Sequence, residues 1–380
     1  MSTVAKPTKP VRLGFIGLST TGWAAMALAP PLFKAPLSSE FSLVAVSTTN
    51  TDSAQATAQK YSELVSSQAD GGPKVTIKPY HGSAEHIAAD RGIDMLVVSV
   101  RATHHKEVAL KVIEGGKDLF IEWPIGRNLA ETREIYEAAL KKGIKTVVGL
   151  QTRFTGYASK VKSIVDSGEI GKTIASSFIV SMGPFASYGP TTTQKYKYIF
   201  DSSNGVTLVD VIGGHLFDLL TYILGPIASL SAILENQIPL ITIIDDHGKP
   251  TDEVIPFDGP HQICVSGVLV SGAVFNVHVQ TGAKETDFNW VIHGEKGTLR
   301  IRDDDRTPGR FGFVDATPKV YLNGNKIEVE NVDTTTTGLA WKAFADGKAG
   351  TYATLEQGLK VKEIVFAIKK SSDGGERVYL

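Results

Sequence analysis

The first 150 residues alternate short apolar runs with longer helix-like segments, and this alternation limits the possible folds more than any other feature of the chain. Strands that alternate with helices form right-handed βαβ units and a parallel sheet covered on both faces. We therefore predict a doubly wound α/β domain over residues 1–150. Its buried strands are expected at residues 11–18, 41–48, 93–100, 118–123 and 145–151.

A doubly wound sheet binds its ligand outside the carboxyl ends of its strands, where the strand order reverses. The loops that follow the predicted strands should therefore converge on one crevice. These loops cover residues 17–22, 47–52, 99–105, 122–128 and 151–153.

After about residue 150 the apolar positions recur with period two, as in antiparallel strands with one covered face. Segments of this kind lie at 172–182, 227–237, 261–282 and 288–302. Two amphipathic helices are predicted at 204–225 and 352–371. We predict that residues 151–380 form an α+β domain with a large open, mainly antiparallel sheet and helices on one side. A chain of 380 residues is long enough for two such domains.

The composition excludes several classes of partner. Lysine and arginine (39) balance aspartate and glutamate (40), so no net field attracts nucleic acid or a membrane surface. The lone cysteine, Cys264, cannot form an internal disulfide, and its apolar surroundings predict a buried thiol. The N-terminus lacks the apolar core of a signal peptide, and no zinc-ligand spacing is present. We expect a cytoplasmic protein without a metal site.

The first strand leads into the sequence "IGLSTTGW", which has the spacing of a dinucleotide-binding turn. Gly17 and Gly22 occupy the outer positions of G-x-G-x-x-G, and Ser19 replaces the middle glycine. The following helix would meet a pyrophosphate with free N–H groups and its positive dipole end. Thr20 and Thr21, with Ser19, add hydroxyl donors. The sequence therefore predicts a Rossmann domain with a dinucleotide cofactor.

The residues at the end of the second strand help to decide whether NAD or NADP binds. A carboxylate there would bind the ribose 2′-hydroxyl of NAD and repel the 2′-phosphate of NADP. This strand ends with Ser47 and Thr48, followed closely by Asn50, and these side chains can donate to a phosphate. We predict NADP, and NAD remains possible because no arginine stands at this position.

These features, with three longer segments, resemble the Gfo/Idh/MocA family of dinucleotide-dependent sugar and inositol oxidoreductases. The segments are residues 104–124, 150–178 and 293–301, so the resemblance covers nearly the whole chain. Within the family, the chain resembles the fungal Gal80 group in having "GW" after the glycine turn, "EW" after the fifth strand, "KYKYIFD" followed by "NGV", and "GGH". Gal80 proteins are longer, and this chain lacks their insertions.

The resemblance implies roles for residues around the nicotinamide. Glu122 should lie near it, and His105 should follow the loop beneath the cofactor. Family enzymes usually carry a catalytic lysine directly after this glutamate, and this chain has Trp123 instead. An indole cannot relay protons, but it can pack on the nicotinamide or on a sugar ring, or it can simply fill the core.

Family enzymes also use a histidine, often four residues beyond an aspartate. His215 matches the histidine. Asp210, a second candidate catalytic acid, is displaced to five residues before it, about 140° around an α-helix, so the two need not share a face. A neutral imidazole can relay a proton. Tyr196 could donate to a carbonyl oxygen as a second catalytic group, and Asp218 could orient His215 or cap a turn.

Two further residues complete the predicted substrate site with Asp218. Arg153, beyond the last strand of the first domain, could neutralise cofactor or substrate, or pair with a carboxylate. Tyr198, like Tyr196, could bind substrate or pack in the core. Specificity is expected to reside in second-domain loops such as residues 183–194.

The preferred hypothesis is an NADP-preferring oxidoreductase that moves hydride between C4 of the nicotinamide and a carbinol carbon of a sugar, polyol or related cyclic alcohol. One alternative is a catalytically silent Gal80-like regulator that binds NAD(P) and a partner protein, which the missing lysine favours. Another is an NAD-assisted glycosidase. By analogy with relatives, the exposed sheet face of the second domain should form a dimer or tetramer.

Overall fold

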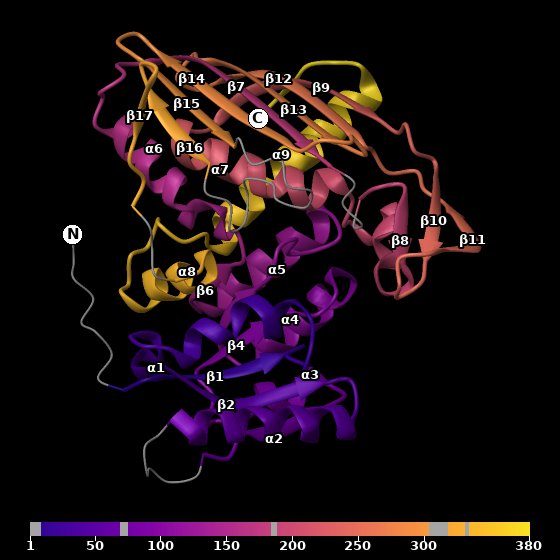
Figure 1. Ribbon diagram of the computed structural model, residues 1–380. Coiled ribbons are helices and arrows are strands. Elements are labelled where there is room, and N and C mark those ends of the chain that lie inside the picture. Colours follow the sequence, from indigo (N-terminus) through magenta and orange to yellow (C-terminus); the bar gives the residue numbers. More distant parts are fainter. Residues whose placement is uncertain (1–8, 69–74, 184–187, 304–317, 331–333) are drawn as a thin grey trace. The chain divides into compact units, whose positions relative to one another are not determined.

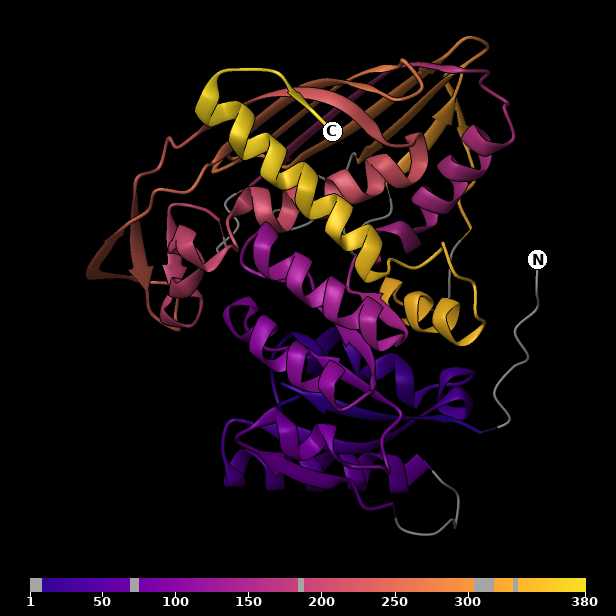
Figure 2. The ribbon, with the colours of Figure 1, turned by 180° about the vertical axis from the view of Figure 1, so that it is seen from behind.

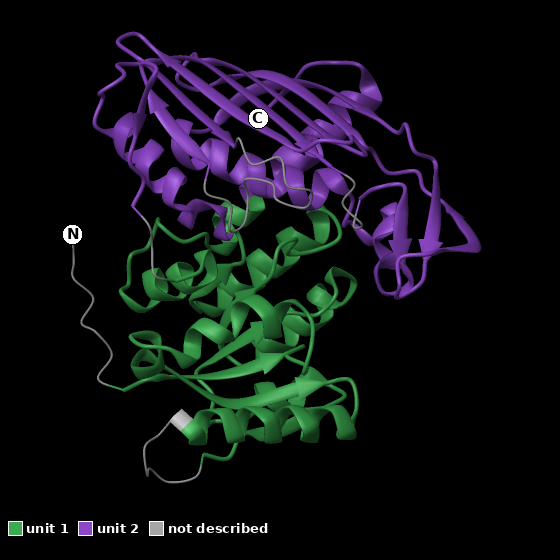
Figure 3. Cartoon of the chain, in the orientation of Figure 1, with its two compact units in different colours: residues 1–150, 334–359 green, residues 151–333, 360–380 purple. Residues whose placement is uncertain are grey.

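The computed structural model describes residues 9–68, 75–183, 188–303, 318–330 and 334–380. The chain divides into two compact units (Figure 3). The first unit contains Met1–Leu150 and Thr334–Leu359, and the second contains Gln151–Asp333 and Lys360–Leu380. The first unit thus takes in residues 334–359, which the sequence analysis placed in the second domain with the rest of residues 151–380.

The first unit is built on a six-stranded parallel sheet with the order β3-β2-β1-β4-β5-β6 (Figure 1). The prediction of a doubly wound α/β domain is confirmed. Strand β3 was not predicted, because its sequence "KPYH" is mostly exposed and contains a proline. The strands are β1 (Val11–Ile16), β2 (Phe41–Thr48), β3 (Lys78–His81), β4 (Met95–Val98), β5 (Asp118–Ile121) and β6 (Thr146–Val148).

The helices of the first unit connect these strands, except α8, which belongs to the C-terminal segment of the unit. Helix α5 shows how the sequence sets its ends: the Asn128 side chain accepts from the Glu131 N–H at 2.9 Å, and Gly143 closes the helix in the left-handed conformation. The segments are η1 (Ala24–Leu28), η2 (Pro30–Phe33), α1 (Leu37–Glu40), α2 (Thr51–Gln68), α3 (Ala84–Ala88), η3 (Ala102–His104), α4 (His105–Glu114), α5 (Leu129–Lys142) and α8 (Thr336–Ala345).

Helix α8 explains why residues 334–359 belong to the first unit. Trp341, only 1% exposed, stacks on Phe120 of β5 with ring centroids 4.7 Å apart. It also contacts Phe41 of β2 edge-on at 5.3 Å, and its indole N–H donates to the Leu28 carbonyl at 3.1 Å. The C-terminal segment thus supplies core packing that the first 150 residues lack.

The second unit is built on a nine-stranded mixed sheet with the order β17-β16-β15-β14-β7-β13-β12-β9-β18. Strands β13 and β7 run parallel, and the other neighbouring pairs are antiparallel. The predicted large, mainly antiparallel sheet is confirmed. The strands are β7 (Thr173–Met182), β9 (Ile227–Glu235), β12 (Gln262–Leu269), β13 (Val274–Thr281), β14 (Asp287–Gly294), β15 (Thr298–Asp303), β16 (Lys319–Leu322), β17 (Asn325–Ile327) and β18 (Val378–Tyr379).

Helices cover one face of this sheet, as Figures 1 and 2 show: α6 (Gly156–Asp166), α7 (Gly214–Leu224) and α9 (Leu355–Gly374). Phe178 and Trp290 point to the covered face and stack at 4.7 Å. The opposite face exposes Ile179 and Ile233, and Cys264 lies in the same row of residues between them. Cys264 is therefore only partly buried, contrary to the prediction, because it alternates out of the core.

Shorter segments complete the second unit. A three-stranded sheet that was not predicted has the order β11-β10-β8. The apolar helical stretch Ser202–Leu224 is long enough to cross a membrane, but 83% of its most apolar window is buried inside the protein, as in a core helix. The remaining segments are η4 (Gln151–Phe154), β8 (Thr191–Thr193), η5 (Gln194–Phe200), η6 (Ser202–Asn204), η7 (Val209–Gly213), β10 (Leu240–Ile244) and β11 (Pro250–Pro256).

Replacing Trp341 tests whether α8 is an integral part of the first unit. Trp341→Ala should lower the free energy of unfolding by about 3–5 kcal/mol, because it leaves a cavity beside Phe120. Trp341→Phe, which keeps a stacked ring and loses the N–H donor, should cost less. Urea unfolding followed by circular dichroism measures both. An unchanged midpoint for Trp341→Ala would show that α8 is dispensable.

Candidate functional site

The glycine turn after β1 combines a closed side and an open side. Gly17 has a φ of +97°, and its N–H donates to the Ser47 carbonyl at 2.9 Å. A Cβ on Gly17 would lie 2.3 Å from the Ser99 carbonyl oxygen, so only glycine fits. Gly22 has a φ of +103°, and a Cβ there would have one neighbour within 4 Å among the described residues, Ser19 Oγ at 3.8 Å. The turn is therefore anchored at Gly17 and open at Gly22.

The turn carries three hydroxyl groups, and one of them donates within the turn itself. Ser19 Oγ donates to the Thr21 carbonyl, and Thr20 and Thr21 are exposed. Lys60 of α2 donates from Nζ to the Thr20 carbonyl at 2.9 Å. Lys60 was not predicted as a site residue, because its position on a helix face does not by itself indicate that it reaches the turn. This lysine places a positive charge beside the predicted pyrophosphate site.

The end of β2 carries small polar groups and no carboxylate. Ser47 is buried, and Thr48 Oγ1 donates to the Asn50 carbonyl at 3.3 Å. Asn50 Oδ1 accepts from the Ser53 N–H at 2.9 Å and so caps the start of α2. His81, at the end of the unpredicted strand β3, lies with Nε2 at 3.3 Å from Thr51 Oγ1. The structure thus adds a histidine to the polar groups at this edge.

His105 joins the loops that follow β4 and β5. Its buried ring places Nδ1 at 2.8 Å from the Pro124 carbonyl oxygen and Nε2 at 3.0 Å from that of Val100. Burial lowers the pKa of His105, although its backbone contacts oppose this shift. His105 therefore holds the shape of the predicted cofactor loops through backbone contacts.

Glu122 is the first residue beyond β5 and has an unusual environment. Its Oε1 is inaccessible to solvent and has no hydrogen-bond partner among the described residues. Gly149 lies so close that a Cβ there would be 2.6 Å from Oε2. Burial raises the pKa of Glu122 to about 8, while hydrogen bonds from the Trp23 side chain and the Trp123 backbone act in the opposite direction. Trp123 itself is buried.

Asp210 in the second unit is part of a buried ion cluster. It accepts from Lys369 Nζ at 2.8 Å, from Lys362 Nζ at 3.2 Å and from Thr207 Oγ1 at 2.6 Å. Burial alone would raise its pKa, but the two lysines outweigh burial and lower it. An ionised aspartate has no proton to donate, so the structure corrects the prediction that Asp210 is a catalytic acid. Both lysines come from α9, far away in the sequence.

Asp210 lies in a π-helix that ends just before His215. The segment η7 spans Val209–Gly213 and runs directly into α7. A π-helix joins residue i to residue i+5, so residues five apart lie one turn from each other. The 140° offset expected for an α-helix therefore does not apply. Inserted turns of this kind occur often at functional sites.

His215 is partly buried on α7, and its Nδ1 lies 3.4 Å from Thr152 Oγ1. Burial lowers the pKa of His215 to about 4, so the imidazole is neutral at physiological pH. This neutral ring can accept a proton. Thr152 was not predicted as a site residue, because a threonine in a loop carries no distinguishing signal.

Arg153 and Asp218 form a buried pair next to His215. Arg153 Nε donates to Asp218 Oδ2 at 2.7 Å, and its Nη2 donates to Oδ1. Arg153 is 5% exposed and Asp218 is fully buried, and the guanidinium also lies 4.7 Å above the Tyr222 ring. Of the alternatives weighed for Arg153, the structure shows pairing with a carboxylate. Asp218 takes both hydrogen bonds from Arg153, which revises its expected roles of binding substrate or orienting His215.

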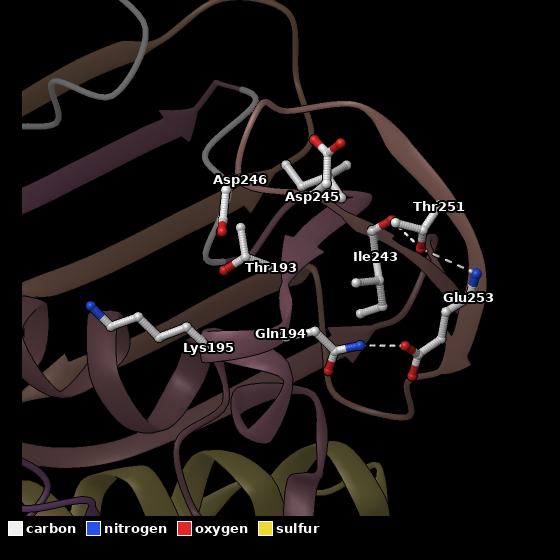
Figure 4. A pocket seen from close by; sticks show the side chains of 9 residues that line it. Thr193, Gln194, Lys195, Ile243, Asp245, Asp246, Thr251 and Glu253 are labelled. Carbon is white, nitrogen blue, oxygen red and sulfur yellow. Dashed lines mark hydrogen bonds between the residues drawn. The ribbon is translucent and has the colours of Figure 1, made fainter.

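Tyr196 and Tyr198 lie on η5, and both are partly exposed. The same segment borders a cavity of about 470 Å³ beside the three-stranded sheet (Figure 4). Glu253 in this cavity already accepts from Gln194 and from Lys197 Nζ, the latter at 2.6 Å. We assign no ligand to this cavity. The expected specificity loop lies partly outside the described residues, at 184–187.

The buried pair of Arg153 and Asp218 should contribute to the stability of the second unit. Asp218→Ala should lower the free energy of unfolding by about 3–5 kcal/mol, because it leaves the Arg153 charge buried and unpaired. The double variant Arg153→Met, Asp218→Leu should recover most of this loss, since it removes both charges. Denaturant unfolding of the single and double variants measures this, and a double variant as unstable as the single one would contradict a purely structural pair.

Comparison with known proteins identifies the family. Residues 11–150 match a family model described as an oxidoreductase family with an NAD-binding Rossmann fold, and residues 157–303 match the Gal80p C-terminal domain. Dehydrogenase aclE of Aspergillus oryzae is 29% identical over 97% of this chain and 98% of its own length. The galactose/lactose metabolism regulatory protein GAL80 of Saccharomyces cerevisiae is 31% identical over 78% of this chain and 67% of its own length.

Solved structures show the same fold. A super-repressor mutant of Gal80p from Saccharomyces cerevisiae superposes with a TM-score of 0.84 at 24% identity, covering 97% of this chain and 98% of that one. Levoglucosan dehydrogenase in complex with NADH and L-sorbose gives a TM-score of 0.77 at 18% identity, covering 98% and 99%. The chain therefore belongs to the Gfo/Idh/MocA oxidoreductase family and to the Gal80-like group within it.

Proposed function

We propose that this protein is an NAD(P)-dependent oxidoreductase, preferring NADP, that transfers hydride to or from a sugar, polyol or related cyclic alcohol. The observation that carries the proposal is the glycine turn, which is anchored at Gly17 and open at Gly22. Such an opening at the end of β1, where the strand order reverses, leaves room for a pyrophosphate. The likeness to dehydrogenase aclE along almost the whole of both chains supports an enzyme.

The residues of the first unit fit a dinucleotide. N–H groups of the turn would face the pyrophosphate, with Lys60 adding a positive charge. Glu122 and Trp123, beyond β5, would lie at the nicotinamide half. When bound, the cofactor accepts or supplies the hydride.

The preference for NADP is argued from the end of β2. No carboxylate stands there to repel a 2′-phosphate. Thr48 offers a hydroxyl, and His81 lies within reach of the start of α2. These groups favour a phosphate over a bare ribose hydroxyl.

His215 is the residue we propose for the proton relay. Its neutral imidazole can take the hydroxyl proton as a carbinol is oxidised, and return it in the reverse direction. Thr152 contacts Nδ1, which leaves Nε2 for the substrate. Arg153 acts as a positioning residue, because its pair with Asp218 fixes the helix that carries His215.

A second candidate is a regulator that binds NAD(P) and a partner protein. The GAL80 relatives are regulatory proteins, and Trp123 replaces the usual family lysine. For either function we propose a cytoplasmic dimer or tetramer. Its interface would be the uncovered face of the nine-stranded sheet, where Ile179, Ile233 and Val274 are exposed.

A panel of sugars and polyols with NADP and NAD, followed at the absorbance band of the reduced nicotinamide, tests the proposal. With a substrate found, His215→Ala should lower the hydride-transfer rate by about 10²–10⁴-fold and leave cofactor affinity unchanged. His293→Ala, at an exposed histidine of β14, is the control and should be fully active. A fully active His215→Ala would overturn the relay, and no turnover across the panel would favour the regulator.

A further inference from the structure

We propose that Glu122 responds to the charge of the bound nicotinamide: this carboxyl releases its proton when the protein binds NADP⁺ and keeps it when the protein binds NADPH. The inference rests on the cofactor site proposed above. It assigns to Glu122 the discrimination between the oxidised and reduced cofactor.

The position of Glu122 in the sheet supports this role. A sheet of order 3-2-1-4-5-6 consists of two mononucleotide-binding halves, and the dinucleotide lies across the point where they meet. The glycine turn and the end of β2 belong to the first half, which leaves β4, β5 and β6 for the nicotinamide. Glu122 follows β5 directly, and its N–H donates to the Val98 carbonyl of β4 at 3.1 Å.

The surroundings of the Glu122 carboxyl leave its ionisation sensitive to any charge that a ligand brings close to it. Among the described residues, the groups beside the carboxyl are neutral: Gly149 after β6, the Trp23 indole beside the glycine turn, and the Trp123 backbone N–H. The nearby titratable residue His105 turns its ring nitrogens to the carbonyls of Val100 and Pro124. One carboxylate oxygen has no partner at all in the described structure. A positive charge brought by a ligand would therefore be the first to reach this group.

The cofactor supplies such a charge in one redox state only. The oxidised nicotinamide ring carries a positive charge, and the reduced ring is neutral. An opposite charge within about 4–6 Å lowers the pKa of a carboxyl by about 1–3 units. Burial holds the pKa of Glu122 at about 8 without the cofactor, so the group is mostly protonated at neutral pH. Binding NADP⁺ would then release a proton to solvent, and binding NADPH would not.

The affinity for the oxidised cofactor should change with pH in one direction. NADP⁺ favours the ionised form, so its affinity rises with pH and levels off above the pKa of the free protein, about 8. The ratio of dissociation constants, NADP⁺ over NADPH, should fall by up to about tenfold per pH unit below that value. Titration of the 2′-phosphate affects both cofactors alike and cancels in the ratio.

Calorimetric titration of the full chain with NADP⁺ and NADPH, from about pH 6 to about pH 9, measures this ratio across the relevant range. Repeating it at neutral pH in two buffers of different ionisation enthalpy counts the protons released. For wild type we expect a falling ratio and release of up to one proton with NADP⁺ alone. For Glu122→Gln, an isosteric neutral side chain, we expect a constant ratio and no release. Glu137→Gln, at an exposed carboxylate of α5, should behave as wild type.

A constant ratio in wild type, or a falling ratio in Glu122→Gln, would overturn the role of Glu122 and leave the proposed cofactor site intact. Failure of wild type to bind either nucleotide would overturn the proposed function, and this inference with it.

Discussion

The close approach of two backbone segments determines the geometry of the first unit. At Gly17 the chain passes the end of β4 so closely that a Cβ would lie 2.3 Å from the Ser99 carbonyl oxygen, while the Gly17 N–H binds the Ser47 carbonyl of β2. The turn is thus held between the strands on either side of β1. The open side at Gly22 and the loop ends at Thr48 and Glu122 face the same carboxyl edge of the sheet as a result.

Buried charges divide into those that are paired and those that are not. In the second unit, Arg153 pairs with Asp218, and Asp210 pairs with two lysines of α9, so these groups hold the helices in place. Glu122 and His215 lack such charged partners among the described residues. Burial raises the pKa of Glu122 and lowers the pKa of His215, so it favours the neutral form of each side chain. A neutral carboxyl can release a proton and a neutral imidazole can accept one, whereas a paired ion changes its charge only by breaking its pair. The chemistry we propose therefore uses the unpaired groups.

The parts of the fold that could be predicted are those that depend on the order of residues close together in the sequence. The parallel sheet, the glycine turn and the alternating strands after residue 150 follow from spacing along the chain. The packing of Trp341 on Phe120 and the pairing of Asp210 with Lys362 join residues far apart in sequence, and no local pattern indicates them. The π-helix before His215 was missed because an α-helical period was assumed. Strand β3 was missed because it is mostly exposed.

The central claim is that the open side of the glycine turn holds the pyrophosphate of a dinucleotide. Its most direct test is calorimetric titration with NADP of wild type, Gly22→Val and Gly143→Val. Gly143 is the matched control, because it is also left-handed, with open space around it, and it lies at the end of α5. The account predicts that Gly22→Val loses affinity by more than about 100-fold, or about 2.7 kcal/mol, while its circular dichroism spectrum stays that of wild type. Undiminished affinity in Gly22→Val, or an equal loss in Gly143→Val, would contradict it.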